Sequence, residues 1–186
     1  PATPRLPSEA EAAFNELVNR GAAPERARAA VANLPGADAL PVGTMEPHTV
    51  STASGRDIAV QPKVVEASSL KTSADAGYDA ALQPRNRGRA ASQMQIDDIA
   101  GNLNPNRLGA SSEADRGAPI VGPDSMVESG NGRVLALRKA YAANGEAAAS
   151  YRAWLAAQGG DVSKFKNPVL VRERATQMTP EERQAF

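Results

Sequence analysis

The sequence of 186 residues has no cysteine and only one histidine, His48. Without cysteine the chain forms no disulfide, offers no thiolate to a metal and has no cysteine nucleophile. A single imidazole is also too few for a histidine-based metal site, since such sites combine several ligands. Any metal site would therefore depend on carboxylates, as sites for Mg²⁺ do.

Aromatic residues are scarce, and charge of neither sign is in excess. Phe, Trp and Tyr make up 4% of the chain, so the 41% of hydrophobic residues must build the core mainly from Ala, Val, Leu and Ile. Twenty-one basic residues balance 21 acidic ones, which argues against a strongly basic surface for nucleic acid but is compatible with a local patch. No apolar run reaches the length of a membrane span, and no signal peptide is visible, so we expect no membrane partner.

Residues 1–40 are expected to form a helical appendage or linker, and residues 41–186 a single further domain. Ser8 and Glu11 make a capping-box pattern at the start of the first of two short helices. Both helices carry few large apolar residues, and Pro35–Gly36 marks a break after them. The appendage is therefore expected to be separable from the domain that follows.

The remaining chain alternates strand and helix signals, which predicts an α/β fold of mixed α+β character, a small sheet with surrounding helices. The first two predicted strands form a hairpin, and the full set is residues 48–52, 57–61, 64–67, 119–121, 126–128 and 168–172. One helix begins at Ser92 and is predicted to bury Met94, and a later helix is anchored by Tyr151. Residues 102–116 form a polar loop too long for an ordinary connection, so we expect it to be mobile or functional.

Residues 119–141 carry the most specific pattern of the chain. A strand, a tight turn and a second strand lead into a glycine-rich loop, after which Arg133 is predicted to begin a helix. We call this loop the glycine box; it consists of Ser129, Gly130, Asn131, Gly132 and Arg133. Such a loop leaves backbone N–H groups unbonded at the positive end of a helix, where phosphate is the usual occupant. A plain strand-to-helix turn, in which glycine only relieves crowding, is an equal alternative.

A cluster of positive charge precedes the Ser92 helix. Arg85, Arg87 and Arg89 fall within five positions. Arginine forks bind phosphate at two points, so the cluster is a candidate anion clamp, with a solvated loop as the equal alternative. Arg172, on the last predicted strand, is expected to be a surface arginine outside the clamp.

These pieces follow one order along the chain. A Gln-Pro-Arg loop, a helix and an Ala-Pro-Ile-Val strand come first, and the run E-S-G-N-G-R-V-L-A-L and a Pro-Val-Leu-Val-Arg strand follow. The order resembles the ParB/sulfiredoxin superfamily, in which an arginine-bearing loop, a helix, a strand and a G-x-x-R box occur in this sequence. The long form of the box looks most like the ddrB-like ParB domains, modules of large polyvalent proteins of phages and conjugative elements. The resemblance covers about residues 64–175.

The resemblance implies a ParB/sulfiredoxin-like fold in which Gly130 and Arg133 wrap nucleotide phosphates, with Asn131 and Gly132 inside the loop. It also implies that Arg85 approaches the same ligand, and that the protein acts in the cytoplasm of a bacterial host cell. Sulfiredoxins carry a cysteine where Gly132 stands, so the likeness does not extend to sulfinic acid reduction. Chromosome-partitioning members carry charged residues inside the box, where this chain has neutral ones, so CTP specificity is not implied.

Three functions are compatible with these features. The first is a module that binds an NTP, ATP or CTP, and hydrolyses it or transfers a phosphoryl group with Mg²⁺. In it the glycine box cradles the phosphates, the arginine cluster neutralises them, and Glu128 is the nearest candidate base or Mg²⁺ ligand. An ordinary edge-strand carboxylate is an equal alternative for Glu128. The second function is a ParB-like nuclease or DNA-binding module, and the third a non-catalytic module that contacts neighbouring modules of a longer parent protein.

Overall fold

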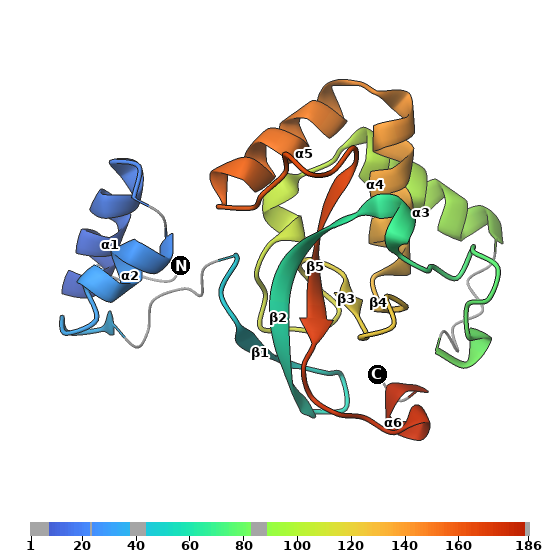
Figure 1. Ribbon diagram of the computed structural model, residues 1–186, viewed down its shortest axis with the longest axis horizontal. Coiled ribbons are helices and arrows are strands. Elements are labelled where there is room, and N and C mark those ends of the chain that lie inside the picture. The colour runs from blue at the N-terminus through green and yellow to red at the C-terminus, as the bar shows by residue number, and fades with distance from the viewer. Residues whose placement is uncertain (1–7, 23, 38–43, 83–88, 185–186) are drawn as a thin grey trace, which may run out of the picture.

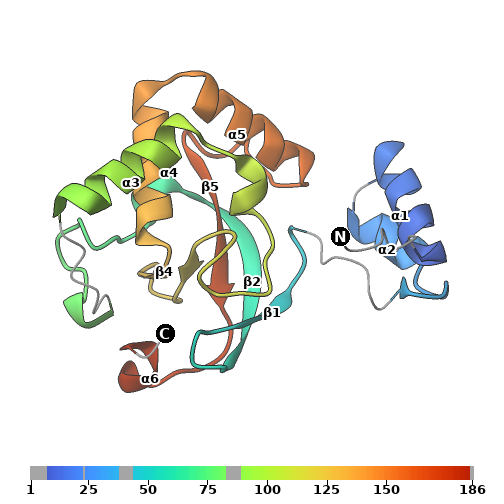
Figure 2. The same cartoon turned by 180° about the vertical axis from the view of Figure 1, so that it is seen from behind.

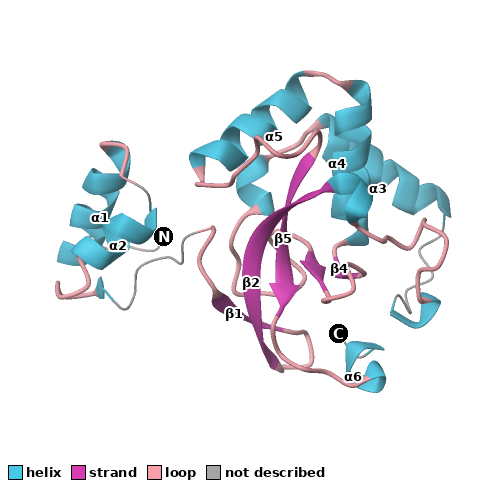
Figure 3. Ribbon diagram, viewed as in Figure 1, coloured by secondary structure: helices cyan, strands magenta, loops and turns pink. Residues whose placement is uncertain are grey.

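The computed structural model describes residues 8–22, 24–37, 44–82 and 89–184, which contain both helices and strands (Figure 3). The α-helices are α1 (Glu9–Asn19), α2 (Pro24–Ala30), α3 (Arg89–Gly101), α4 (Asn131–Ala143), α5 (Glu146–Ala157) and α6 (Pro180–Gln184). The strands are β1 (His48–Ser51), β2 (Asp57–Glu66), β3 (Ile120–Val121), β4 (Val127–Ser129) and β5 (Pro168–Arg174). Short 3-10 turns are η2 (Ala67–Ser69), η3 (Ala80–Leu82) and η4 (Pro105–Leu108). Within the described ranges, no helix is both long and apolar enough to cross a membrane.

A mixed sheet of five strands forms the centre of the α/β fold, in the order β1-β2-β5-β3-β4 (Figure 1). Neighbouring strands are antiparallel, except β3 and β5, which are parallel. An isolated bridge between Lys71 and Met126 extends the pairing beyond β4. The carbonyl of Lys71 accepts the N–H of Val127 at 2.9 Å, so the strand that leads to the glycine box is bonded on both sides.

β2 is one continuous strand through Pro62, whereas the sequence predicts two strands separated at this proline. Pro62 pairs with Arg172 of β5, whose backbone N–H is directed away from β2 and bonds the carbonyl of Pro119 at 2.8 Å. The pair is therefore of the type that exchanges no hydrogen bonds, and Pro62 lies past the last residue of β2 that pairs with β1. Because neither ladder needs an N–H at this position, the strand tolerates proline.

Two apolar clusters fill the two sides of the sheet. The successive residues Ile120 and Val121 of β3 belong to different clusters, as side-chain alternation along a strand requires. In the larger cluster α4 and α5 pack on β5, and the hydroxyl of the fully buried Tyr151 accepts the N–H of Leu170 at 3.0 Å. The smaller cluster joins β1, β2 and β3, and Met178, which follows β5, packs against it.

α1 and α2 form a helix pair with its own apolar cluster, to one side of the sheet in Figures 1 and 2. The N–H of Glu11 donates to the hydroxyl of Ser8 at 3.1 Å, which confirms the predicted cap of α1. Arg28 forms an ion pair of 2.7 Å with Glu46, just before β1. The division near residue 40 into two separable parts stays a prediction.

α3 differs from its prediction at its start and on its buried side. The helix begins at Arg89 rather than at Ser92. Met94, predicted to be buried, is 69% exposed, while Ala100 is buried. α3 packs against α4, and a helix that rests on one neighbour buries only a narrow stripe of its surface. Met94 lies outside that stripe.

Candidate anion-binding site

A single residue, Gly130, makes the turn from β4 into α4. Its φ of 96° and ψ of 29° lie in the left-handed region that favours glycine. The sequence predicts a loop as far as Gly132 and a helix from Arg133, but Asn131 and Gly132 already belong to the first helical turn. The predicted start is two residues late because one left-handed glycine is enough to redirect the chain.

The first turn of α4 presents backbone N–H groups without a side-chain cap from the described residues. The carbonyl of Gly130 accepts the N–H groups of Arg133 and Val134, at 3.0 and 3.1 Å. The N–H groups of Asn131 and Gly132 precede that pattern and lie at the positive end of the helix dipole. All five residues of the glycine box are partly exposed, so a small anion has access to this end of α4.

The Arg133 side chain folds back across the glycine box. Its guanidinium donates to the carbonyl of Gly117 at 2.5 Å and to the hydroxyl of Ser129 at 3.3 Å. A Cβ placed on Gly130 would lie 2.7 Å from the Arg133 guanidinium nitrogens, so the absence of a side chain at Gly130 makes room for this fold. The Ser129 hydroxyl in turn donates to the carbonyl of Ala114 at 2.8 Å. The box is thus tied to the chain segment that precedes β3.

That segment is organised by Arg172, whose side chain is fully buried. The Arg172 guanidinium donates to the carbonyls of Ala118 at 2.8 Å and Ser111 at 3.0 Å. It also donates to those of Glu113, Ala114 and Arg116. The prediction of a surface arginine is therefore wrong, because the alternation of β5 turns Arg172 into the protein, where backbone carbonyls solvate its charge. The same contacts hold much of the 102–116 loop in place.

Asn131 holds the segment that follows β2 rather than pointing into open space. Its side-chain oxygen accepts the N–H of Ser73 at 2.8 Å, and its amide donates to the hydroxyl of Tyr78 at 3.1 Å. The Tyr78 hydroxyl donates to the carbonyl of Val127 at 2.7 Å. Burial raises the pKa of Tyr78, although the hydrogen bond from Asn131 partly lowers it, so the hydroxyl stays protonated at neutral pH. The side-chain amide of Asn131 is thus engaged by Ser73 and Tyr78, and an anion-binding role for this residue stays a prediction.

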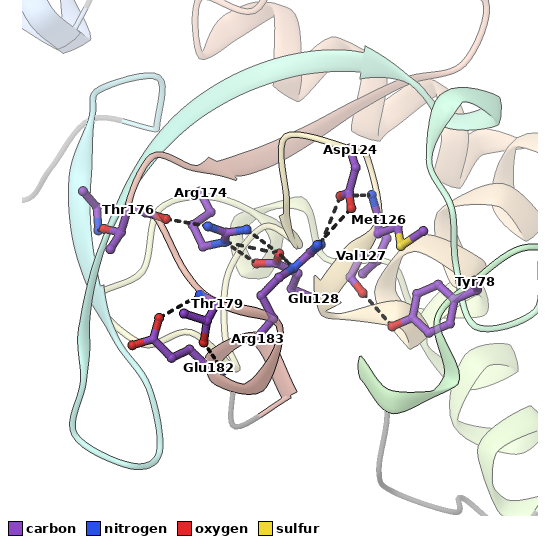
Figure 4. A network of polar contacts seen from close by, with 11 residues as sticks. Tyr78, Asp124, Met126, Val127, Glu128, Arg174, Thr176, Thr179, Glu182 and Arg183 are labelled. Atoms are coloured by element: carbon purple, nitrogen blue, oxygen red, sulfur yellow. Dashed lines mark hydrogen bonds and ion pairs between the residues drawn. The ribbon is translucent and has the colours of Figure 1, made fainter.

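Glu128, the predicted base or metal ligand, lies between two arginines (Figure 4). Arg174 donates to both carboxylate oxygens through three contacts of 2.9 to 3.2 Å. Arg183 of α6 donates to Oε1 at 2.7 Å. The Glu128 side chain is 0% exposed, so in this arrangement its charge is engaged by guanidinium groups and screened from solvent. A catalytic role for Glu128 stays a prediction, and it requires Arg183 to move.

Of the arginine cluster, Arg85 and Arg87 lie outside the described residues, and Arg89 is described only as the first residue of α3. The two elements on either side of the cluster can be placed. η3 precedes it and contacts α6, and α3 follows it and packs on α4. The expectation that these arginines approach the glycine box stays a prediction.

An open cleft of about 930 Å³ lies elsewhere, where α4 meets α5. It is lined by Arg138 and Arg152 among others, but both guanidinium groups bind backbone carbonyls of the surrounding loops. Arg138 also forms an ion pair of 2.9 Å with Asp75. These arginines hold loops together, so the cleft does not add to the anion site at the start of α4.

Sequence reasoning missed Arg174 and Arg183 as partners of Glu128. The sequence contains a hint for Arg174. It stands two positions after Arg172, and residues two apart in a strand lie on the same side of the sheet. Nothing local marks Arg183, whose partner lies 55 residues earlier. In the part of the chain that the structure describes, no group of three or more His, Asp or Glu side chains is placed to hold a metal ion.

One comparison with known proteins gives a match. The family described as ddrB-like ParB superfamily domain matches residues 53–175. The match contains the sheet from β2 onward and the whole glycine box, and it excludes α1, α2 and α6. No curated protein and no solved structure matches the chain.

Proposed function

Because the chain belongs to the ddrB-like ParB superfamily, we propose that it is a module that binds the phosphates of a nucleoside triphosphate, ATP or CTP, at the start of α4. The observation that carries this proposal is the N-terminus of α4. Gly130, in the left-handed conformation, precedes the helix and provides no side-chain cap. The Arg133 guanidinium lies directly beside Gly130. Backbone N–H groups and a permanent positive charge at one point are what a phosphate group requires.

Within this proposal the members of the glycine box have different roles. The backbone N–H groups of Asn131 and Gly132 bind phosphate oxygens. Arg133 neutralises them after a change of rotamer that moves its guanidinium from the Gly117 carbonyl to the ligand. Ser129 positions Arg133 through the 3.3 Å contact with its hydroxyl. Gly130 supplies the turn and leaves room for the arginine.

The arginine cluster supplies the second half of the proposed clamp. Arg85, Arg87 and Arg89 would bind the outer phosphates in two-point fashion. The proposal is supported by the elements on either side of the cluster, since α3 packs on α4 and η3 contacts α6, whose Arg183 binds Glu128 of β4. An arginine on that connection has long reach, because its guanidinium ends a flexible stem.

Hydrolysis or phosphoryl transfer with Mg²⁺ is the finer form of the proposal, and the residues fit it only in part. Glu128 directly precedes the box, but Arg174 and Arg183 already bind its carboxylate. The carboxylate therefore does not suit a Mg²⁺ ligand or a general base in this arrangement. We propose nucleotide binding as the activity and derive no chemical step through a metal.

Titration calorimetry with ATP, CTP and GTP, each with and without Mg²⁺, tests the proposal. A short DNA duplex in the same series tests the alternative of a DNA-binding or nuclease module. Arg133→Ala should weaken nucleotide binding by about ten-fold or more, because a charge-assisted contact contributes roughly 1.5–3 kcal/mol. Arg20→Ala is the matched control, since Arg20 is an exposed arginine just after α1, far from the glycine box in the sequence, and forms an ion pair with Glu16.

Unchanged nucleotide affinity in a folded Arg133→Ala variant would contradict the proposal and leave the glycine box as a plain turn. Binding of duplex DNA but of no nucleotide would favour the alternative. A melting curve for each variant separates loss of the site from loss of the fold.

A further inference from the structure

α6 is held to the domain by charged side chains rather than by apolar burial. None of the residues of α6 is buried. Arg183 binds Asp124 through two contacts, at 3.0 and 3.1 Å, and Glu128 at 2.7 Å. Glu182 forms an ion pair of 2.8 Å with Arg56 in the β1–β2 turn. The apolar anchor is Met178, which lies before the helix and packs on the smaller core cluster.

These ion pairs place α6 beside β4, the strand that leads into the glycine box. Asp124 belongs to the turn between β3 and β4, and Glu128 to the strand that ends at the box. α6 also contacts η3, and the charge of Arg183 acts on Tyr78, which binds Asn131 at the start of α4. Figure 4 draws the Arg183 guanidinium between Glu128 and Asp124, and Tyr78 bonded to the carbonyl of Val127, the residue of β4 next to Glu128.

The arrangement allows α6 to leave without exposing a buried charge that lacks a partner. If Arg183 withdraws, Glu128 keeps its three contacts with Arg174. Asp124, which would lose Arg183, has a side chain that is already 40% exposed. Glu182, which would move with α6, has a side chain that is already 38% exposed. The half-exposed pair of Glu182 with Arg56 contributes little to stability and weakens with salt, whereas salt screens the mostly buried Arg183–Glu128 contact less. β5, in contrast, is buried along most of its length.

We propose that α6 is an electrostatic latch on the glycine-box side of the sheet, closed by Arg183 on Glu128 and Asp124 and opened by release of Arg183. The latch follows Ala175, the last residue of the family match, so it lies outside the matched domain. Its opening is a local event, because the sheet and the Glu128–Arg174 pair remain intact. That the latch controls access of a nucleotide to α4 rests on the proposed function.

Hydrogen–deuterium exchange on the full chain tests the latch without any ligand. Arg183→Gln keeps a polar side chain, although a shorter one, and removes its charge, and Arg20→Gln, just after α1, is the matched control. In Arg183→Gln the backbone amides of α6 should exchange about ten-fold faster, while those of β5 stay unchanged. Raising NaCl from about 50 mM to about 500 mM should speed α6 exchange in the unaltered protein, because the Debye length shortens to a few ångströms.

Equal α6 exchange in the unaltered protein and in Arg183→Gln would overturn the latch. Faster exchange of α6 and β5 together would also overturn it, since α6 would then be part of the global fold. A second measurement adds nucleotide: Arg183→Gln should raise the association rate several-fold, and Arg20→Gln should not. If the unaltered protein binds no nucleotide, the proposed function fails, while the exchange data still decide the latch.

Discussion

The guanidinium groups of Arg133 and Arg172 bind carbonyls of adjacent residues, Gly117 and Arg116. One arginine comes from the glycine box and the other from the opposite side of β3, so the segment before β3 links the box to the centre of the sheet. Burial, and then the nearby charge of Arg133, lower the pKa of Arg172. The site and the core are therefore not independent, and a change in either is expected to reach the other.

Arg172→Ala should destabilise the domain by about 3 kcal/mol or more, because the carbonyls that Arg172 binds would stay buried without a donor. Urea denaturation measures the free energy of unfolding. Arg116→Ala is the control, since the Arg116 side chain is 74% exposed and its removal should change stability by only about 0.5 kcal/mol. Equal effects of the two substitutions would contradict the structural role given to Arg172.

Gly130→Ala should cost more stability than Gly55→Ala. Both glycines have positive φ, 96° and 78°, so both substitutions carry a backbone strain of about 1–2 kcal/mol. A Cβ at Gly55 meets no atom within 4 Å, whereas at Gly130 it must displace the Arg133 guanidinium from its contacts. Urea denaturation measures the loss of unfolding free energy in each variant. The loss in Gly130→Ala minus the loss in Gly55→Ala is the contribution of the Arg133 contacts. A difference of zero would mean that Arg133 moves aside without loss.

Stability should depend on pH through Asp75. Burial alone would raise the pKa of Asp75, but hydrogen bonds from Thr72 and Arg138 outweigh it and hold the pKa below its usual value. A lowered pKa means that the carboxylate contributes stability above its unfolded pKa of about 3.9, and that this is lost as pH falls through the lower folded pKa. Melting temperatures of Asp75→Asn and the unaltered protein should therefore differ at pH 7 and converge in strong acid. A gap that stays constant at all pH values would exclude a contribution from ionised Asp75.

Residues 41–186, expressed without the helix pair, should give a cooperative melt. The pair α1 and α2 has its own apolar cluster, and Arg28–Glu46 is an ion pair between it and the chain before β1. Arg28 and Glu46 are 27% and 17% exposed, and without the helix pair the Glu46 carboxylate is open to water rather than left buried, so the loss should be small. A non-cooperative melt would show that the helix pair is needed by the domain.

Features set by neighbouring residues could be predicted from the sequence. The cap of Ser8 with Glu11 and the hairpin of β1 and β2 involve groups a few positions apart, so the pattern contains both partners. The glycine box before α4 was found for the same reason. Its start was misplaced by two residues because the conformation of Gly130, rather than its identity alone, decides where the helix begins.

Tertiary structure decided the partners of the charged residues. Glu128 reads as an edge-strand carboxylate or a catalytic group, and only the fold brings it Arg174 and Arg183, 46 and 55 residues away. Arg172 reads as a surface residue, and only the placement of β5 between β2 and β3 encloses it in carbonyls. The physical reason is the sequence separation between the interacting groups. Caps and turns are hydrogen bonds between residues a few positions apart, so the local sequence contains both partners. The environment of a buried charge depends instead on which distant segments pack around it.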